Sequence, residues 1–310
     1  LSLLRGIDGS SYGAYKRCLG EWTYPTFKVY LDRIQSDPYA PPSALRIVAD
    51  PKKMGLPADT ISTPAQQLAT GDFLVRAFKE AIRSQGRGPI SIVGTSQEIL
   101  DRSAAVVTPE KVELRIQVQL PARGRTIQGK QAAMIFSRQL PDVVNQTLDF
   151  WSEDAAEYLA DLIRHVHTYE DHQALHQALV DNNWVSFIND GAILPRRSGV
   201  SELPMEGAVP FESPASLQRT VVLPHAGTVS GMAIEPGITL IVGGGYHGKS
   251  TVLAAIQRGV YSHVPGDGRE LVASLPQAMK IRAADGRPIT KVDVSPFINH
   301  LPMKSNTQEF

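Results

Sequence analysis

Alternating apolar and polar positions predict a strand at residues 111–120. The apolar positions are Val112, Leu114, Ile116, Val118 and Leu120, and the positions between them are Lys111, Glu113, Arg115, Gln117 and Gln119. Successive side chains of a strand point to opposite faces, so we expect one face to be buried and the other to be solvated. A second strand is expected at Ala44–Ala49.

Helical periodicity predicts three helices in the first 200 residues. They cover residues 73–82, with Asp72 placed to cap the helix, residues 130–138 and residues 153–180. Further along the chain, the β-branched run Ile238–Val242 predicts a short strand, and Ser250–Arg258 predicts a helix.

Proline and glycine recur between Pro195 and Pro214 too often for a regular element, which indicates a seam between two domains. We therefore expect an α+β N-terminal domain at residues 1–200 and an α/β domain at residues 201–310. No internal repeat or low-complexity tract is found.

Composition excludes several classes of protein. Of the 310 residues, 42% are hydrophobic, which is enough for a large core. Basic and acidic residues number 31 each, so no overall field attracts nucleic acid or an anionic membrane. A single cysteine, Cys18, excludes an internal disulfide framework. The sequence has no apolar stretch long enough to span a bilayer.

The segment Gly243–Ser250, GGGYHGKS, matches the pattern G-x-x-x-x-G-K-[ST] of a phosphate-binding loop. A predicted strand before it and a predicted helix after it are the context that this loop requires. Glycines let the backbone take positive φ and approach phosphate oxygens, so that several N–H groups point at one anion. The flanking elements favour this interpretation over a glycine-rich turn with a surface lysine.

Each loop residue then has an expected role. Lys249, the expected catalytic residue, would neutralise the β- and γ-phosphates, and Ser250 would bind Mg²⁺. The N-terminus of the following helix would direct its positive dipole at the same anion. The residues expected to bind ATP or ADP with Mg²⁺ are Gly243, Gly244, Gly245, Tyr246, His247, Gly248, Lys249, Ser250 and Thr251.

Basic residues concentrate between Lys111 and Arg138, where Glu113 is the only acid. A hairpin tip at residues 121–125 beside a basic helix could follow a phosphate backbone. The same residues could instead meet the acidic helix at residues 142–181 or simply be solvated. The candidate nucleic-acid contacts are Arg115, Arg123, Arg125 and Lys130, followed by Arg196 and Arg197.

Four histidines, His165, His167, His172 and His176, crowd one predicted helix. His172 and His176 have the i, i+4 spacing of a zinc pair. Because no H-E-x-x-H motif is formed and no cysteine lies nearby, a solvated helix face is favoured over a metal site.

The phosphate loop, with Gly244–His247 at its variable positions, resembles that of the predicted ATPases of the ABC class. Leu223–Gly227, Gly259–Glu270 and Ser36–Ser43 share this resemblance, which spans nearly the whole chain. It implies an ABC-type P-loop domain fused to an additional N-terminal domain, without transmembrane partners. The chain is also similar to the family member that is an accessory factor of mitochondrial RNA editing in kinetoplastids and binds RNA.

One expected part of such an ATPase is missing from the sequence. Hydrolysis needs an apolar strand that ends in Asp, followed by a catalytic acid, and neither is found. Too few residues follow the phosphate loop to complete an ABC-type sheet. We therefore expect the Walker B acid and the family signature beyond Phe310.

The resemblance implies a C₂ homodimer in which ATP lies between the phosphate loop of one subunit and the signature of the other. Three functions stay open. The first is a homodimeric ATPase that binds RNA in a basic cleft or pore and acts, alone or in a larger complex, in mitochondrial RNA processing or editing. The second is an ABC-type ATPase that remodels a protein assembly without RNA contact, and the third is a small-molecule phosphotransferase. A mitochondrial location is implied by the resemblance alone, and the cytoplasm is the alternative.

Overall fold

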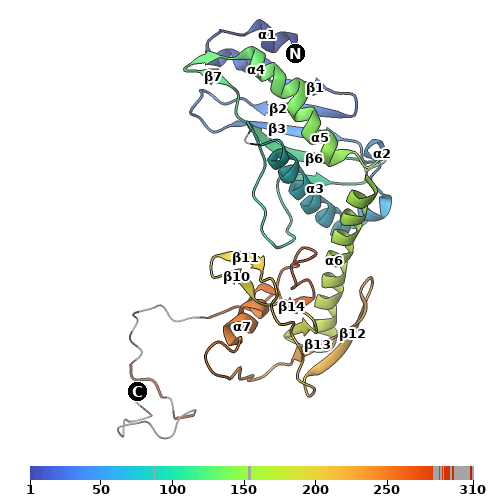
Figure 1. Cartoon of the computed structure of the whole chain (residues 1–310), viewed down its shortest axis with the longest axis vertical. Coiled ribbons are helices and arrows are strands. Elements are labelled where there is room, and N and C mark those ends of the chain that lie inside the picture. The colour runs from blue at the N-terminus through green and yellow to red at the C-terminus, as the bar shows by residue number, and fades with distance from the viewer. Residues whose placement is uncertain are drawn as a thin grey trace. The chain divides into compact units, whose positions relative to one another are not determined.

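A computed structural model describes residues 1–86, 88–152 and 155–281, together with residues 286, 288, 290–293, 295, 296 and 308. The chain divides into two units, Leu1–Pro276 and Gln277–Phe310. The helices and strands assigned in the described residues all lie in the first unit (Figure 1).

An antiparallel sheet organises the N-terminal half of the first unit. It has the order β1-β2-β3-β6-β4, and β5 also pairs with β6. The strands are β1 (Gly20–Thr23), β2 (Phe27–Arg33), β3 (Ser43–Ala49), β4 (Ile90–Ser91), β5 (Ala105–Val107) and β6 (Val112–Val118). Every second side chain of β3 is buried, as the strand period requires. The strands predicted at residues 44–49 and 111–120 are thereby confirmed as β3 and β6.

The polar face of β6 is not uniformly solvated, because Glu113 is only 3% exposed. Its carboxylate accepts hydrogen bonds from Lys111 Nζ (3.1 Å) and Arg115 Nε (3.0 Å), and Arg46 of β3 lies 3.6 Å away. Burial acts to raise the pKa of Glu113, but these hydrogen bonds and charges outweigh it and lower the pKa. The expectation of a wet face fails here because three cations stabilise the buried acid.

Helices α3, α4 and α5 lie across one face of this sheet (Figure 1). The predicted helix at residues 130–138 is α4 (Gly129–Met134) followed by a π-helical turn, η3 (Ile135–Gln139), which leads into α5 (Leu140–Leu148). The other elements of this half are α1 (Ser2–Gly6), η1 (Tyr12–Cys18), α2 (Pro51–Met54), η2 (Ala58–Thr60), α3 (Pro64–Ser84), β7 (Ala122–Arg123) and β8 (Thr126–Ile127).

The expectation that Asp72 caps a helix is wrong. Helix α3 begins at Pro64, where Thr63 accepts the N–H of Gln66 (3.2 Å) and Gln66 Oε1 accepts the N–H of Thr63 (3.1 Å), a capping box. Asp72 lies inside the helix and is 1% exposed. A mid-helix aspartate is tolerated there because basic side chains surround its carboxylate.

Helix α6 (Ala155–Asp181) confirms the helix predicted near residues 153–180 and belongs to two cores. Leu162 and Val166 pack into the core of the N-terminal sheet, whereas Leu175 and Leu179 pack with Trp184 in a second core. The change of core therefore falls within this one continuous helix.

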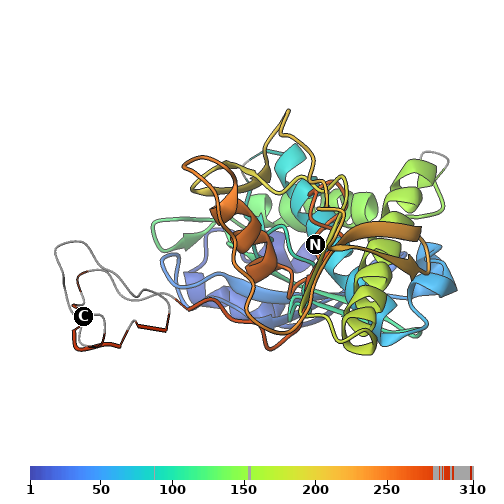
Figure 2. The same ribbon diagram turned by 90° about the horizontal axis from the view of Figure 1, so that it is seen from below.

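A second antiparallel sheet has the order β12-β13-β9-β14. Its strands are β9 (Ser186–Asn189), β12 (Gln218–Leu223), β13 (Gly227–Ile234) and β14 (Val272–Ser274), while β10 (Arg196–Ser198) and β11 (Ser201–Pro204) form a separate pair. Figure 2 shows the β12–β13 ribbon beside α6. Helix α7 (Lys249–Arg258) packs against this sheet in a third core cluster, where its Ala255 lies with Val272 of β14. None of the described helices has the length and apolarity needed to cross a membrane.

Candidate nucleotide site

The glycine-rich loop leads from β13 to α7 and follows the backbone geometry that its glycines predict. Positive φ occurs at Gly243 (146°) and Gly248 (78°), and Gly248 occupies the N-cap of α7. Side chains with a Cβ rarely adopt such values, so glycine suits both positions. Tyr246 also has positive φ (61°) and is fully exposed.

Lys249 folds back over the loop. Its Nζ donates a hydrogen bond to the carbonyl of Gly243 (2.7 Å) and another to that of Gly244. The N–H of Gly244 is also engaged, because it donates to His247 Nδ1 at 3.0 Å. An incoming phosphate would offer its oxygens to both the ammonium and the N–H in place of these internal acceptors.

Helix α7 confirms the helix predicted at residues 250–258, and it starts at Lys249. Ser250 is exposed and Thr251 half-buried in its first turn. The unpaired N–H groups and the dipole of this turn favour an anion in front of the loop. The glycine conformations and the helix start at Lys249 thus fit a phosphate site, and the binding roles of Gly243–Thr251 stay predictions.

The strand expected at Ile238–Val242 does not form among the described residues. This segment is outside the sheet, and Ile238, Leu240 and Val242 are 88%, 79% and 81% exposed. A strand needs neighbours for its backbone N–H and C=O groups, and no other described strand pairs with this segment. The β-branched composition alone therefore does not decide its conformation.

The C-terminal end of α7 is held from several sides. Ser274 Oγ donates to the carbonyl of Ile256 (2.7 Å), and the Ser274 N–H donates to Gly259 (2.8 Å). Arg258 forms ion pairs with Glu98 of the N-terminal half and with Glu202, each at 2.8 Å. The helix that carries the phosphate loop is thus anchored away from the loop itself.

Pro265–Glu270, the family-like run after the loop, forms an anchored turn. Asp267 accepts from Arg196 Nη2 at 2.6 Å, and Arg269 Nε donates to the Leu194 carbonyl at 3.0 Å. Burial raises the pKa of Asp267 to about 6, against the opposing charge of Arg196. These contacts give the run a structural role.

The candidate nucleic-acid residues separate into two groups. Arg115, Arg196 and Arg197 are paired with Glu113, Asp267 and Glu206 respectively. Arg123, Arg125 and Lys130 are exposed on and beside the β7–β8 hairpin, and their side chains have no ion-pair or hydrogen-bond partner in the described part of the chain. The predicted hairpin tip is therefore present, whereas the paired arginines already have internal partners.

His172 and His176 do not face a common metal position. His172 Nε2 lies 3.2 Å from the Val272 carbonyl, and His176 Nε2 lies 3.3 Å from the Gly259 carbonyl. The two imidazoles instead contact the backbone of β14 at Val272 and the backbone at the C-terminal end of α7 at Gly259. The solvated helix face expected for them is also wrong, because His172 is fully buried and His176 half-buried.

Buried histidines predict that stability falls with mild acid. Burial lowers the pKa of His172 to about 3, and burial, partly opposed by Glu98, lowers that of His263 to about 4. An unfolded histidine binds a proton near pH 6.5, so the unfolded chain gains protons first as pH falls. We expect the free energy of unfolding to drop by about 2 kcal/mol or more from pH 7 to pH 5. Equal urea midpoints at both pH values would contradict this.

Sequence comparison supports the chemistry that the loop geometry suggests. A family model described as the P-loop domain of ABC ATPases matches residues 159–310. A second model, described as the N-terminal domain of ATPases of the ABC class, matches residues 1–150. A comparison with curated proteins finds no match. The expected Walker B acid and signature beyond Phe310 lie outside the described residues. Since both models describe the same class and together cover nearly the whole chain, this protein belongs to the family of ABC-class ATPases, which bind nucleotide through a P-loop.

Proposed function

We propose that this protein is an ATP-dependent RNA-binding ATPase that acts as a homodimer. The observation that carries the proposal is a group of exposed basic side chains at one end of the N-terminal sheet, here called the basic end. Its members are Arg5, Lys16, Arg17, Arg123, Arg125 and Lys130.

Backbone contacts bring the segments of the basic end together. The N–H of Tyr12 in η1 donates to the carbonyl of Arg125 (3.0 Å), and Ser11 forms a β-bridge with Thr126. The N–H of Gly129, at the start of α4, donates to Asp8 Oδ1 at 2.6 Å. In Figure 1, α1, α4 and β7 lie at the same end of the domain.

The charge of the basic end is available to a ligand. None of its six side chains has an ion-pair or hydrogen-bond partner among the described residues, unlike Arg115 and Arg196. Unpaired, solvated cations neutralise phosphates and release counterions, which is the main source of non-specific affinity for nucleic acid. A neutral protein with such a local group fits RNA better than it fits a small-molecule acceptor.

A physical connection supports coupling of nucleotide binding to this domain. The segment at residues 97–99 pairs with the segment that follows α7, through Ile99 N–H to Ser262 (2.8 Å) and Val264 N–H to Gln97 (2.9 Å). Together with the Arg258–Glu98 ion pair, these bonds link the phosphate-loop helix to the N-terminal half. A shift of α7 on binding ATP and Mg²⁺ would therefore displace residues 97–99 of the N-terminal half.

The resemblance to a mitochondrial RNA-editing factor, which rests on the sequence motifs alone, extends the proposal to mitochondrial RNA processing, within a larger complex. A head-to-tail dimer would complete each nucleotide site, in keeping with an exposed phosphate loop. The dimer is tested by light scattering, where the mass should double when ATP and Mg²⁺ are added. A mass that stays monomeric with saturating ATP would exclude the dimer.

The RNA-binding prediction is tested with the double variant Arg123→Ala, Arg125→Ala. Loss of two phosphate contacts should lower the slope of log affinity against log salt for single-stranded RNA by about 1.4. Filter binding at several KCl concentrations, with and without ATP, measures this slope.

The matched control is the double variant Arg83→Ala, Arg164→Ala, which removes two exposed arginines that each pair with an acid on their own helix. Its salt slope should equal that of the wild type. An unchanged slope in the hairpin variant, or a loss confined to the control, would exclude the basic end as the RNA contact. Phosphate release without RNA binding would favour action on a protein assembly.

A further inference from the structure

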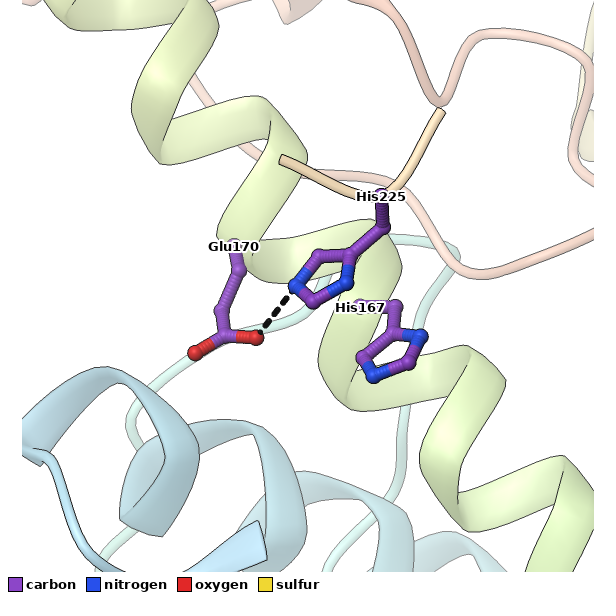
Figure 3. Close-up of side chains that lie close together, drawn as sticks. All are labelled: His167, Glu170 and His225. Atoms are coloured by element: carbon purple, nitrogen blue, oxygen red, sulfur yellow. Dashed lines mark hydrogen bonds and ion pairs between the residues drawn. The ribbon is translucent and has the colours of Figure 1, made fainter. Parts of the chain in front are cut away.

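Two histidines and a glutamate far apart in sequence meet beside the turn between β12 and β13 (Figure 3). His167 and Glu170 are one turn apart on α6, and His225 lies in the β12–β13 turn. One ligand atom from each side chain can be chosen so that all three lie within 4.8 Å of one another. In the described part of the chain, this is the one such group of three potential metal ligands.

The backbone of the turn is fixed to α6 independently of these side chains. The two carboxylate oxygens of Asp171 accept the N–H groups of His225 and Ala226, each at 2.8 Å. Because Asp171 is buried, this clamp holds the backbone at His225 against the helix. The backbone position of His225 is therefore set before any ligand arrives.

The side chains already face one another. His225 Nε2 lies 2.7 Å from Glu170 Oε2, and the rings of His225 and His167 stack with centroids 3.6 Å apart and planes 7° from parallel. One ring nitrogen of each histidine thereby lies within 4.8 Å of an oxygen of the same carboxylate. The side chains of His225 and Glu170 stay 30% and 21% exposed, which leaves a path for an ion from solvent.

An outer partner orients the carboxylate. Glu170 Oε1 accepts a hydrogen bond from Gln66 Nε2 at 3.0 Å, so that Oε2 is left for the histidines. Gln66 is itself held by the capping box of α3, where its Oε1 accepts the N–H groups of Ser62 and Thr63. Carboxylates and imidazoles that bind metals are commonly oriented by a hydrogen bond to another residue that does not bind the metal.

We propose that His167, Glu170 and His225 form a zinc site that fastens the β12–β13 turn to α6. Two imidazoles and one carboxylate are a ligand set of Zn²⁺, whereas Mg²⁺ and Ca²⁺ prefer oxygen alone. Bonds of about 2.0–2.1 Å place tetrahedral ligand atoms about 3.4 Å apart. The contact of 2.7 Å between His225 Nε2 and Glu170 Oε2 must therefore open, and any wider separation within the 4.8 Å limit must close. Rotation of the imidazoles out of their stack achieves this, and water fills the fourth position.

The site lies at a point where it would affect the phosphate loop. Strand β13 runs from the clamped turn to Ile234, residues 235–242 connect it to the phosphate loop, and α6 packs into both cores. Zinc would therefore stiffen the strand from which the connection to the loop starts, without touching nucleotide. The inference is independent of the RNA-binding proposal, because it concerns the metal alone.

The test is a zinc titration of the full chain, stripped with chelator, against a chromophoric zinc indicator without nucleotide or RNA. The wild type should bind one tight equivalent, and Glu170→Gln and His225→Asn should each weaken it by about 100-fold. Glutamine keeps the volume and the Gln66 contact, so Glu170→Gln tests the ligand even if His225→Asn folds poorly. The matched control is Asp161→Asn, another carboxylate on α6, and it should bind like the wild type.

X-ray absorption at the zinc edge identifies the atoms that bind the ion. It therefore separates loss of a zinc ligand from a general loss of stability. We expect nitrogen and oxygen ligands only, with the signature of two imidazoles. A sulfur ligand would implicate Cys18 and overturn the assignment, as would wild-type affinity in Glu170→Gln or the absence of a tight equivalent in the wild type.

Discussion

Replacing Lys249 by alanine should abolish tight ATP binding, with a loss of affinity of at least about 100-fold. The ammonium donates to the carbonyls of Gly243 and Gly244, inside the loop, where phosphate oxygens would take their place. Hydrogen bonds from a charged donor contribute about 1.5–3 kcal/mol each, and about 1.4 kcal/mol corresponds to a factor of ten. Loss of two such bonds to phosphate oxygens therefore gives the expected decrease. Equilibrium titration with a fluorescent ATP analogue and Mg²⁺ measures it.

Two comparisons make the Lys249 result specific. Lys79→Ala removes an exposed lysine of α3 and should leave the ATP affinity unchanged. Circular dichroism should show that Lys249→Ala keeps its helix content, because the lysine contributes to no core cluster. Wild-type affinity in a folded Lys249→Ala protein would mean that the phosphate site lies elsewhere.

The largest effect on stability is expected for Asp72→Asn, a loss of about 3–5 kcal/mol. Asp72 accepts from Arg76 Nε (2.6 Å) and from Arg102 Nε (2.5 Å), and His165 Nε2 lies 3.2 Å from it. An amide keeps the shape but removes the charge, which leaves two largely buried guanidinium groups without their anion. Urea unfolding followed by circular dichroism measures the loss.

The pKa of Asp72 gives the physical reason for this sensitivity. Burial alone would raise it, but contact with His165 and the charge of Arg76 lower the pKa to about 2. The carboxylate is therefore charged throughout the neutral range, and its stabilising effect is lost only as pH falls below about 4 towards 2. Glu80→Gln is the matched control on α3, since its pair with Arg83 is exposed and contributes about 0–1 kcal/mol. Equal destabilisation by both variants would refute the buried network.

Local patterns were sufficient for the elements whose information lies in adjacent residues. Spacing along one segment is enough to predict the alternating strands β3 and β6, the long helix α6 and the helix after Gly248. The phosphate loop belongs to the same class, because its backbone geometry depends on its own glycines.

Tertiary structure decided what depends on partners distant in sequence. Asp72 is not the cap of α3, because the capping box at Thr63 starts the helix earlier. Which side chains pair with its buried carboxylate depends on Arg102 and His165, which lie far from it in the sequence. The sequence around Arg196 indicates an unpaired cation, but the fold pairs its guanidinium with Asp267, which lies far along the chain. The run Ile238–Val242 has strand composition but no described neighbour to pair with.

The histidines of α6 illustrate the same division. Their sequence spacing suggested His172 with His176, yet it is His167 that meets His225, a residue on a turn that no periodicity connects to α6. Sequence by itself therefore determined the secondary structure with strong local periodicity, the phosphate loop and the family. Only the folded chain decided which charges are paired, which histidines meet and which end carries free cations, because burial and long-range contacts set the energy of each polar group.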